Sequence, residues 1–140
     1  MPTAKNLVQE TEKFFNHYWN ISKEEPPFWS ERWDFNSSIP NNEKRGCYAL
    51  FNGQELIYIG VEIGKSFGKY LGSGLGDRLK RYWKVNKDQN SDVKYMPTDD
   101  WLELTSLMTI GFEEKDYPLA AALEIYLINK LNPLRNSKHK

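Results

Sequence analysis

Two tyrosines in the stretch 46–60, GCYALFNGQELIYIG, occupy positions from which they could take part in catalysis. The stretch predicts two short strands around an Asn52-Gly53 turn, and each strand carries one tyrosine, Tyr48 or Tyr58, with a glycine two positions outside it. A phenol can donate or accept a hydrogen bond, but its pKa near 10 makes it a poor base unless its surroundings lower that pKa. Tyrosine is also an ordinary strand residue, so the hairpin alone leaves packing and catalysis open.

The register of this hairpin decides whether the two tyrosines share a face of the sheet. A two-residue Asn52-Gly53 loop pairs Phe51 with Gln54 and places Tyr48 and Tyr58 on opposite faces. A loop with an odd number of residues, or a β-bulge near the turn, brings both side chains to one face. A shared active site therefore predicts an odd loop or a bulge.

A carboxylate interrupts an apolar helix farther along the chain. The helix is predicted to begin near Asp116 or Tyr117 and to end at Asn132-Pro133, and within 119–128 only Glu124 is neither apolar nor aromatic. A helix that is apolar all round is expected to be buried, and burying an unpaired charge is costly. Glu124 therefore needs an arginine from elsewhere, a metal ion or a catalytic role.

An arginine and a third tyrosine follow the hairpin. The segment 77–86, DRLKRYWKVN, predicts a short helix in which Arg78 and Tyr82 are i, i+4 neighbours. The glycine-rich loop before it, 61–76, lacks the Gly-Lys-Ser/Thr ending of a nucleotide-binding P-loop, which argues against nucleotide binding. Residues 61–87 carry seven Lys or Arg against two Asp or Glu. Such a block is usually a solvated face, but it also supplies candidate nucleic-acid contacts. These candidates are Lys65, Lys69, Lys80, Arg81 and Lys84.

The remaining elements would position these groups. An amphipathic helix is predicted over 3–20, capped by Thr3, with one apolar face made of Leu7, Phe14, Phe15, Tyr18 and Trp19. An irregular arm over 24–45 is rich in aromatic residues. We expect four of them to pack in the core, with base stacking as the lesser alternative. They are Phe28, Trp29, Trp33 and Phe35. Residues 87–100 read as a polar loop, and 101–112 as a strand.

Length and composition limit the class of protein. The 140 residues suffice for one domain, and the aromatic fraction of 14% argues against disorder. No apolar run approaches the roughly 20 residues of a membrane span, and the N-terminal stretch lacks the apolar core of a secretion signal. The single cysteine, Cys47, cannot form an internal disulfide. The expectation is a soluble, cytoplasmic protein with no membrane partner.

Taken in order, these elements resemble the GIY-YIG nuclease family. The resemblance covers about residues 45–137, and the N-terminal 44 residues lie outside it. Five short elements, each weak alone, match with compatible spacing. They are Gly46-Cys47-Tyr48, Tyr58-Ile59-Gly60, Arg78 with Tyr82, Glu124 in LEIYLI, and Asn136 in NPLRN.

The resemblance implies an α/β (α+β) fold, with a small, mostly antiparallel three-stranded sheet flanked by helices. The nuclease domain would span 45–140, and the helix and aromatic arm of 1–44 would pack on it. The implied activity is hydrolysis of DNA phosphodiester bonds, in duplex or branched DNA, with one Mg²⁺ or Mn²⁺ ion held by Glu124. A homodimer or a protein partner could supply specificity.

The resemblance also implies a role for each site residue. Arg78 would hold the scissile phosphate, because its planar fork can bond two oxygens. Tyr48 would serve as the base, tuned by Arg78, by the metal or by a hydrogen bond from Tyr58, and Tyr82 is the other phenol within reach. Asn136 would position Glu124 or a backbone carbonyl.

Two other functions stay open from the sequence. Many family members have a lysine directly after the second triplet, where this chain has Val61. This departure and the acidic stretch 88–124 are compatible with a nucleic-acid-binding module that has lost cleavage. In a third interpretation, Arg78 and Glu124 form only a buried ion pair in a structural or interaction protein.

Overall fold

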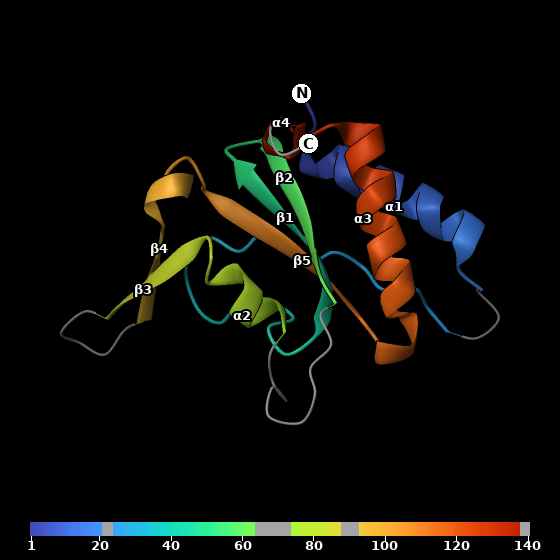
Figure 1. Ribbon diagram of the computed structural model, residues 1–140, viewed down its shortest axis with the longest axis horizontal. Helices are drawn as coiled ribbons and strands as arrows, with labels where there is room; N and C mark the ends of the chain where they lie inside the picture. The colour runs from blue at the N-terminus through green and yellow to red at the C-terminus, as the bar shows by residue number, and fades with distance from the viewer. Residues whose placement is uncertain (21–23, 64–73, 88–92, 138–140) are drawn as a thin grey trace.

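The computed structural model describes residues 1–20, 24–63, 74–87 and 93–137. The fold is mixed α+β, and its centre is an antiparallel three-stranded sheet with the order β2-β1-β5 (Figure 1). The strands are β1 (Arg45–Asn52), β2 (Glu55–Glu62) and β5 (Ser106–Phe112). The expectation of a small antiparallel three-stranded sheet flanked by helices is confirmed. Within the described ranges, no helix has the length and apolar character needed to cross a membrane.

Two long helices cover one face of this sheet. They are α1 (Ala4–Tyr18) and α3 (Tyr117–Leu131), which lie side by side in Figure 1. Thr3 caps α1 as predicted, in a reciprocal capping box with Asn6. Asn132 ends α3 in the left-handed conformation, with φ of 47°.

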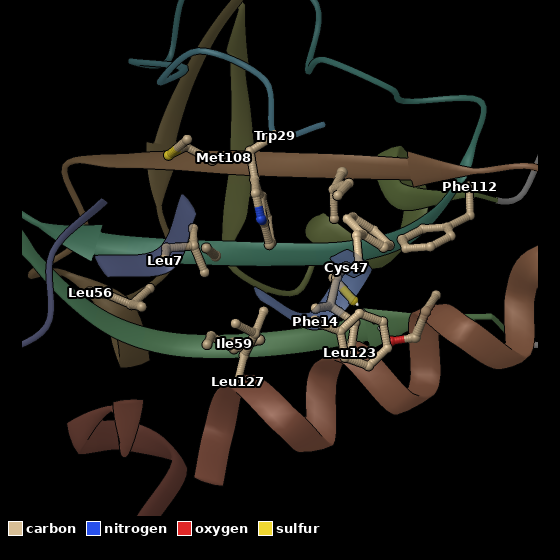
Figure 2. Packing of buried hydrophobic residues seen from close by; sticks show 14 of the residues in the cluster. Leu7, Phe14, Trp29, Cys47, Leu56, Ile59, Met108, Phe112, Leu123 and Leu127 are labelled. Atoms are coloured by element: carbon tan, nitrogen blue, oxygen red, sulfur yellow. Dashed lines mark hydrogen bonds between the residues drawn. The ribbon is translucent and has the colours of Figure 1, made fainter. Parts of the chain in front are cut away.

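The core between these helices and the sheet is almost wholly apolar (Figure 2). Alternate residues of β1 point into it, and Leu123 and Leu127 of α3 pack against them. Tyr18, the final residue of α1, was expected on the buried face of the helix but is 62% exposed, so this part of the prediction is wrong. The buried members of this core are Leu7, Phe14, Phe15, Trp29, Cys47, Ala49, Phe51, Leu56, Ile59, Met108, Ile110, Phe112, Ala120, Leu123 and Leu127.

The opposite face of the sheet carries smaller elements. A short helix, α2 (Leu75–Leu79), is followed by a two-stranded sheet of β3 (Trp83–Lys87) and β4 (Val93–Pro97), and by a 3₁₀ turn, η2 (Asp99–Trp101). A second core lies here. Its buried members are Trp33, Ile39, Tyr48, Leu50, Ile57, Leu75, Leu79, Tyr82, Trp83, Leu104 and Leu107.

The predicted helix over 77–86 forms only as far as Leu79, and the loop predicted over 87–100 contains the strand β4, while residues 88–92 of it lie outside the described ranges. The helix ends at Leu79, and the chain then turns into β3, where Trp83 pairs with Pro97 of β4. The ring of Trp83 meets that of Trp33 edge to face, with centroids 5.8 Å apart. Burial of this indole against the aromatic arm overrides the local helix propensity, which is a weak determinant.

The aromatic arm runs along the outer edge of β5. Trp33 exchanges two backbone hydrogen bonds with Leu107, at 2.8 and 3.1 Å, and the Trp29 indole N–H donates to Thr11 Oγ1 of α1 at 2.8 Å. Burial of Trp29 and Trp33 is confirmed, and Phe35 is half-buried against the second core. Phe28 is 82% exposed, so its predicted burial is wrong. In extended chain, neighbouring side chains point to opposite sides, and Trp29 takes the inward one.

Two short elements complete the chain. A 3₁₀ turn, η3 (Glu114–Asp116), leads into α3, and the helix α4 (Leu134–Ser137) follows it. In Figure 1, α4 lies beside the part of β2 that leaves the hairpin turn, and β2 is one edge of the sheet. This contact links the last described residues to the hairpin.

Candidate functional site

The hairpin brings Tyr48 and Tyr58 to the same face of the sheet. Asn52 pairs with Glu55, so the loop is Gly53-Gln54, and the Asn52-Gly53 loop is not adopted. The pairing shifts between Leu50 and Phe51, beyond which Tyr48 lies opposite Gly60. The prediction of a bulge is therefore confirmed, and the two tyrosine rings lie 6.2 Å apart between centroids.

Gly60 explains why a glycine accompanies the tyrosines. A Cβ atom at this position would lie 2.2 Å from Tyr48 Cζ and 2.3 Å from its hydroxyl oxygen. The ring of Tyr48 therefore crosses directly over Gly60. Gly46 has a different neighbour, since a Cβ there would lie 2.0 Å from the carbonyl oxygen of Ile110 in β5. The two glycines of the hairpin therefore permit two different close contacts, one with the Tyr48 ring and one with the Ile110 carbonyl.

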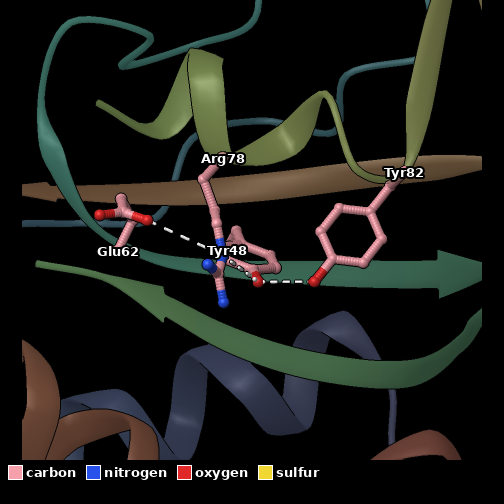
Figure 3. Close-up of polar contacts among 4 residues, drawn as sticks. All are labelled: Tyr48, Glu62, Arg78 and Tyr82. Carbon is pink, nitrogen blue, oxygen red and sulfur yellow. Dashed lines mark hydrogen bonds and ion pairs between the residues drawn. The ribbon is translucent and has the colours of Figure 1, made fainter. Parts of the chain in front are cut away.

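The side chains of Arg78 and Tyr82 meet at the Tyr48 hydroxyl (Figure 3). The hydroxyl oxygens of Tyr48 and Tyr82 share a hydrogen bond of 2.7 Å. Arg78 Nε donates to Tyr48 Oη at 3.5 Å and lies 3.8 Å from Glu62 Oε2, at the end of β2. Arg78 is on α2, and Tyr82 lies in the turn beyond that helix, where its N–H donates to the carbonyl of Leu79. The hydrogen-bond partner of Tyr48 is thus Tyr82, and Tyr58 makes only ring contact with it.

Burial governs the protonation of the phenols. Burial raises the pKa of Tyr48, and the hydrogen bonds from Tyr82 and Arg78 oppose this only in part. Burial also raises the pKa of Tyr82, and the neighbouring Tyr48 raises it further. Both hydroxyls therefore stay protonated at neutral pH in the protein alone. Tyr48 could act as a base only as the phenolate, and added positive charge would have to lower its pKa for that form to be populated.

Glu124 lies on α3, and its carboxylate is half-buried. Burial raises the pKa of Glu124, and the charge of Arg78 lowers it. Among the described residues, no hydrogen bond or ion pair engages this carboxylate, so the expected alternative of an Arg78–Glu124 ion pair is not formed there. The prediction that α3 is buried all round is wrong, because Ile125 is 60% exposed. One side of α3 faces solvent, which is how Glu124 avoids full burial.

Asn136 fixes the backbone of the second triplet. Its side-chain amide accepts from Ile59 N and donates to Ile59 O, both at 2.9 Å. These two hydrogen bonds satisfy the N–H and C=O groups of Ile59 at the edge of the sheet, as a neighbouring strand would. Of the two expected roles for Asn136, the structure places it on a backbone carbonyl and away from any hydrogen bond with Glu124.

The structure describes three of the five residues predicted to contact nucleic acid. Lys80, Arg81 and Lys84 are exposed on the segment that follows Arg78, and Lys84 Nζ lies 3.9 Å from Asp99 Oδ1. Lys65 and Lys69 lie outside the described residues. The basic surface near the site therefore includes at least three exposed cations.

Sequence reasoning missed two neighbours of the site. Trp101 of η2 contacts the rings of Tyr58 and Tyr82, at 5.4 and 4.9 Å between centroids, and the guanidinium of Arg135 lies 3.7 Å over its ring. Nothing in the spacing of the sequence indicates this contact. Glu62 could have been found, because it lies two residues beyond Gly60 and strand alternation places it on the face of Tyr58.

The described side chains contain no group of three or more His, Cys, Asp or Glu that could hold a metal ion. An oxygen-preferring ion such as Mg²⁺ often takes only one or two carboxylates and completes its shell with water and phosphate oxygens. The Glu124 carboxylate, which has no ion pair among the described side chains, fits that mode of binding. No family model, curated protein or solved structure matches this chain.

Proposed function

We propose that this protein is a metal-dependent DNA endonuclease of the GIY-YIG type, which hydrolyses phosphodiester bonds by water attack. The observation that supports this most is that the side chains of Tyr82 and Arg78 both form hydrogen bonds with the Tyr48 hydroxyl. Two buried phenols and an arginine, one phenol from β1 and the other groups from α2 and the turn after it, are linked by hydrogen bonds, and the charge of that arginine also acts on Glu124. Ordinary packing does not require buried phenols, a cation and a carboxylate with no ion pair among the described residues to gather.

Arg78 is the phosphate-binding group in this proposal. Its Nε is engaged by Tyr48 and Glu62, whereas no described residue accepts a hydrogen bond from its two terminal nitrogens. Partial burial lowers the pKa of Arg78, but the raising effects, of which the hydrogen bond with Tyr48 is the largest, more than offset it, so the side chain stays cationic. Two terminal N–H groups on a fixed guanidinium match two oxygens of a phosphodiester.

Glu124 would hold the Mg²⁺ or Mn²⁺ ion, which supplies stabilisation of charge on the phosphate and on the leaving oxygen when bound. Tyr48 would first release its hydroxyl proton to solvent, and the phenolate, which accepts a hydrogen bond from Tyr82, would then take the proton of the attacking water and return to the phenol. Arg78 favours the same phenolate through its charge. Tyr58 lines the same face, and Asn136 keeps the strand that carries it in place.

A module that binds nucleic acid without cutting it is the second candidate. The raised pKa values of Tyr48 and Tyr82 favour it, because a phenol that holds its proton tightly is a poor base. In that case, Arg78 and the exposed Lys80, Arg81 and Lys84 would serve binding alone.

A nicking assay separates the two functions. Supercoiled and branched DNA are incubated with the protein in EDTA, in Mg²⁺ or in Mn²⁺. Tyr48→Phe should lower metal-dependent nicking by about 100-fold or more, the usual range for an acid–base group, and Glu124→Ala should lower it at least as much because it removes the proposed metal ligand. Glu114→Ala and Tyr95→Phe, which lie outside the site, are the matched controls and should cut like the unmodified protein. Binding that weakens with salt, without nicking in any metal, would support the second candidate.

A further inference from the structure

Glu62 is an acidic residue placed beside the proposed phosphate-binding arginine. Its Oε2 lies 3.8 Å from Arg78 Nε, and the two side chains are 22% and 28% exposed. Figure 3 shows the carboxylate of Glu62 and the hydroxyl of Tyr48 both directed at the Arg78 side chain. The proposed phosphate-binding position at Arg78 therefore already has the negative charge of Glu62 beside it.

This ion pair is too loose to be mainly a structural clamp. The 3.8 Å separation exceeds the 2.7–2.9 Å typical of a charge-assisted hydrogen bond, and partly exposed pairs contribute little to stability. Arg78 already has a second anchor in Tyr48. A carboxylate this close to the guanidinium still repels any phosphate that approaches Arg78, whichever nitrogens receive it.

We propose that Glu62 is a specificity-determining residue that lowers the affinity of the Arg78 site for isolated phosphate. The inference rests on the proposed function, since it concerns the same guanidinium. Free phosphate would bind poorly against this repulsion. A phosphodiester within DNA would be held by additional contacts along the strand, such as those of the exposed Lys80 and Arg81, and would reach Arg78 despite Glu62.

The test measures binding of inorganic phosphate without metal, so it does not depend on cleavage. Phosphate is titrated in EDTA, and the Arg78 Nε–H signal is followed by NMR. Glu62→Gln, which keeps the shape and removes the charge, should bind phosphate about fivefold more tightly at low salt, with a smaller difference at high salt. The matched control is Glu55→Gln at the other end of β2, which should bind phosphate like the unmodified protein.

A double-variant cycle tests whether the effect acts through Arg78. In an Arg78→Ala background, followed by whole-protein chemical shifts, Glu62→Gln should change phosphate affinity little. The inference is overturned by equal affinity of Glu62→Gln and the unmodified protein, by an equal gain in the Arg78→Ala background, or by no phosphate response in any variant. If the unmodified protein nicks DNA but Glu62→Gln leaves the phosphate affinity unchanged, only the inference about Glu62 is overturned. The expected affinity gain without nicking in any metal would overturn the endonuclease proposal alone.

Discussion

Strand β1 faces two different environments, and alternate residues divide between them. Cys47, Ala49 and Phe51 enter an apolar core under α1 and α3, where the Cys47 thiol donates to the Ala120 carbonyl at 3.2 Å. Tyr48, on the other face, is just as buried but brings a hydroxyl into contact with a phenol and a charged guanidinium. We call the face of the sheet covered by α1 and α3 the helix face, and the face that carries Tyr48 the tyrosine face. The helix face stabilises the fold by burying apolar surface, whereas the tyrosine face buries polar groups that must stay hydrogen-bonded.

The largest stability effect should come from the helix face. Leu123→Ala removes a fully buried side chain of α3 and should cost about 3 kcal/mol of unfolding free energy, through lost burial and a residual cavity. Urea denaturation measures the loss. On the same helix, Ile125→Ala removes a 60% exposed side chain and should stay within about 0.5 kcal/mol. Equal losses for the two would contradict the assignment of this face as the stabilising one.

Gly60→Ala should damage the tyrosine face next most strongly. The added Cβ would overlap the Tyr48 ring, so the ring must move, at a cost of about 2 kcal/mol, and nicking should fall with it. Gly53→Asn is the matched control. Its φ of 58° suits asparagine and no atom lies within 4 Å of the new Cβ, so it should cost under about 1 kcal/mol. Unchanged nicking in Gly60→Ala would show that the position of Tyr48 is not critical.

Asn136→Ala should have a smaller effect, confined to the edge of the tyrosine face. It removes both hydrogen bonds to Ile59 and should cost about 1–2 kcal/mol. Hydrogen exchange at Ile59 N–H should accelerate more than exchange in the core of β1. Asn129→Ala, at an exposed position of α3, should leave both measurements unchanged. Protection of Ile59 equal to that in the unmodified protein would rule out the strand-like role of Asn136.

The smallest effect should be a pH dependence from Glu124. Because burial raises its folded-state pKa, its protonation favours the folded state, so this contribution to stability is fully present below the unfolded-state pKa and is lost as pH rises through the folded-state pKa. Glu124→Gln should therefore be slightly more stable than the unmodified protein at neutral pH, with the gap closing in acid. Urea midpoints across pH 4–8 measure this. A less stable Glu124→Gln at neutral pH would show that the carboxylate has a stabilising partner.

The sequence predicted elements whose patterns are local. The N-terminal helix carried clear periodicity and a Thr3 cap, α3 carried a continuous apolar run that stops at Asn132-Pro133, and the bulge followed from requiring Tyr48 and Tyr58 on one face. The chain from 77 to 100 could not be predicted in this way. Trp83 becomes part of a strand because it packs on Trp33, fifty residues earlier, and no local pattern contains that contact.

The same distinction applies to the site. The types and order of its residues could be read from the sequence, but their partners could not. The sequence offered Tyr58 as a hydrogen-bond partner for Tyr48 and Glu124 as an ion-pair partner for Arg78, whereas the structure gives Tyr82 and Glu62. Each partner depends on where α2 ends and on how far β2 extends, and tertiary packing sets both.

The bonds between Asn136 and Ile59 have a consequence for the synthesis of the chain. A ribosome adds residues from the N-terminus, so the hairpin with its two tyrosines is made long before the residue that fixes its outer strand. At roughly 5–20 residues per second, the interval between Ile59 and Asn136 lasts seconds. During that interval the strand lacks its final support, and a chain interrupted before Asn136 would carry every tyrosine of the site on an unsupported edge.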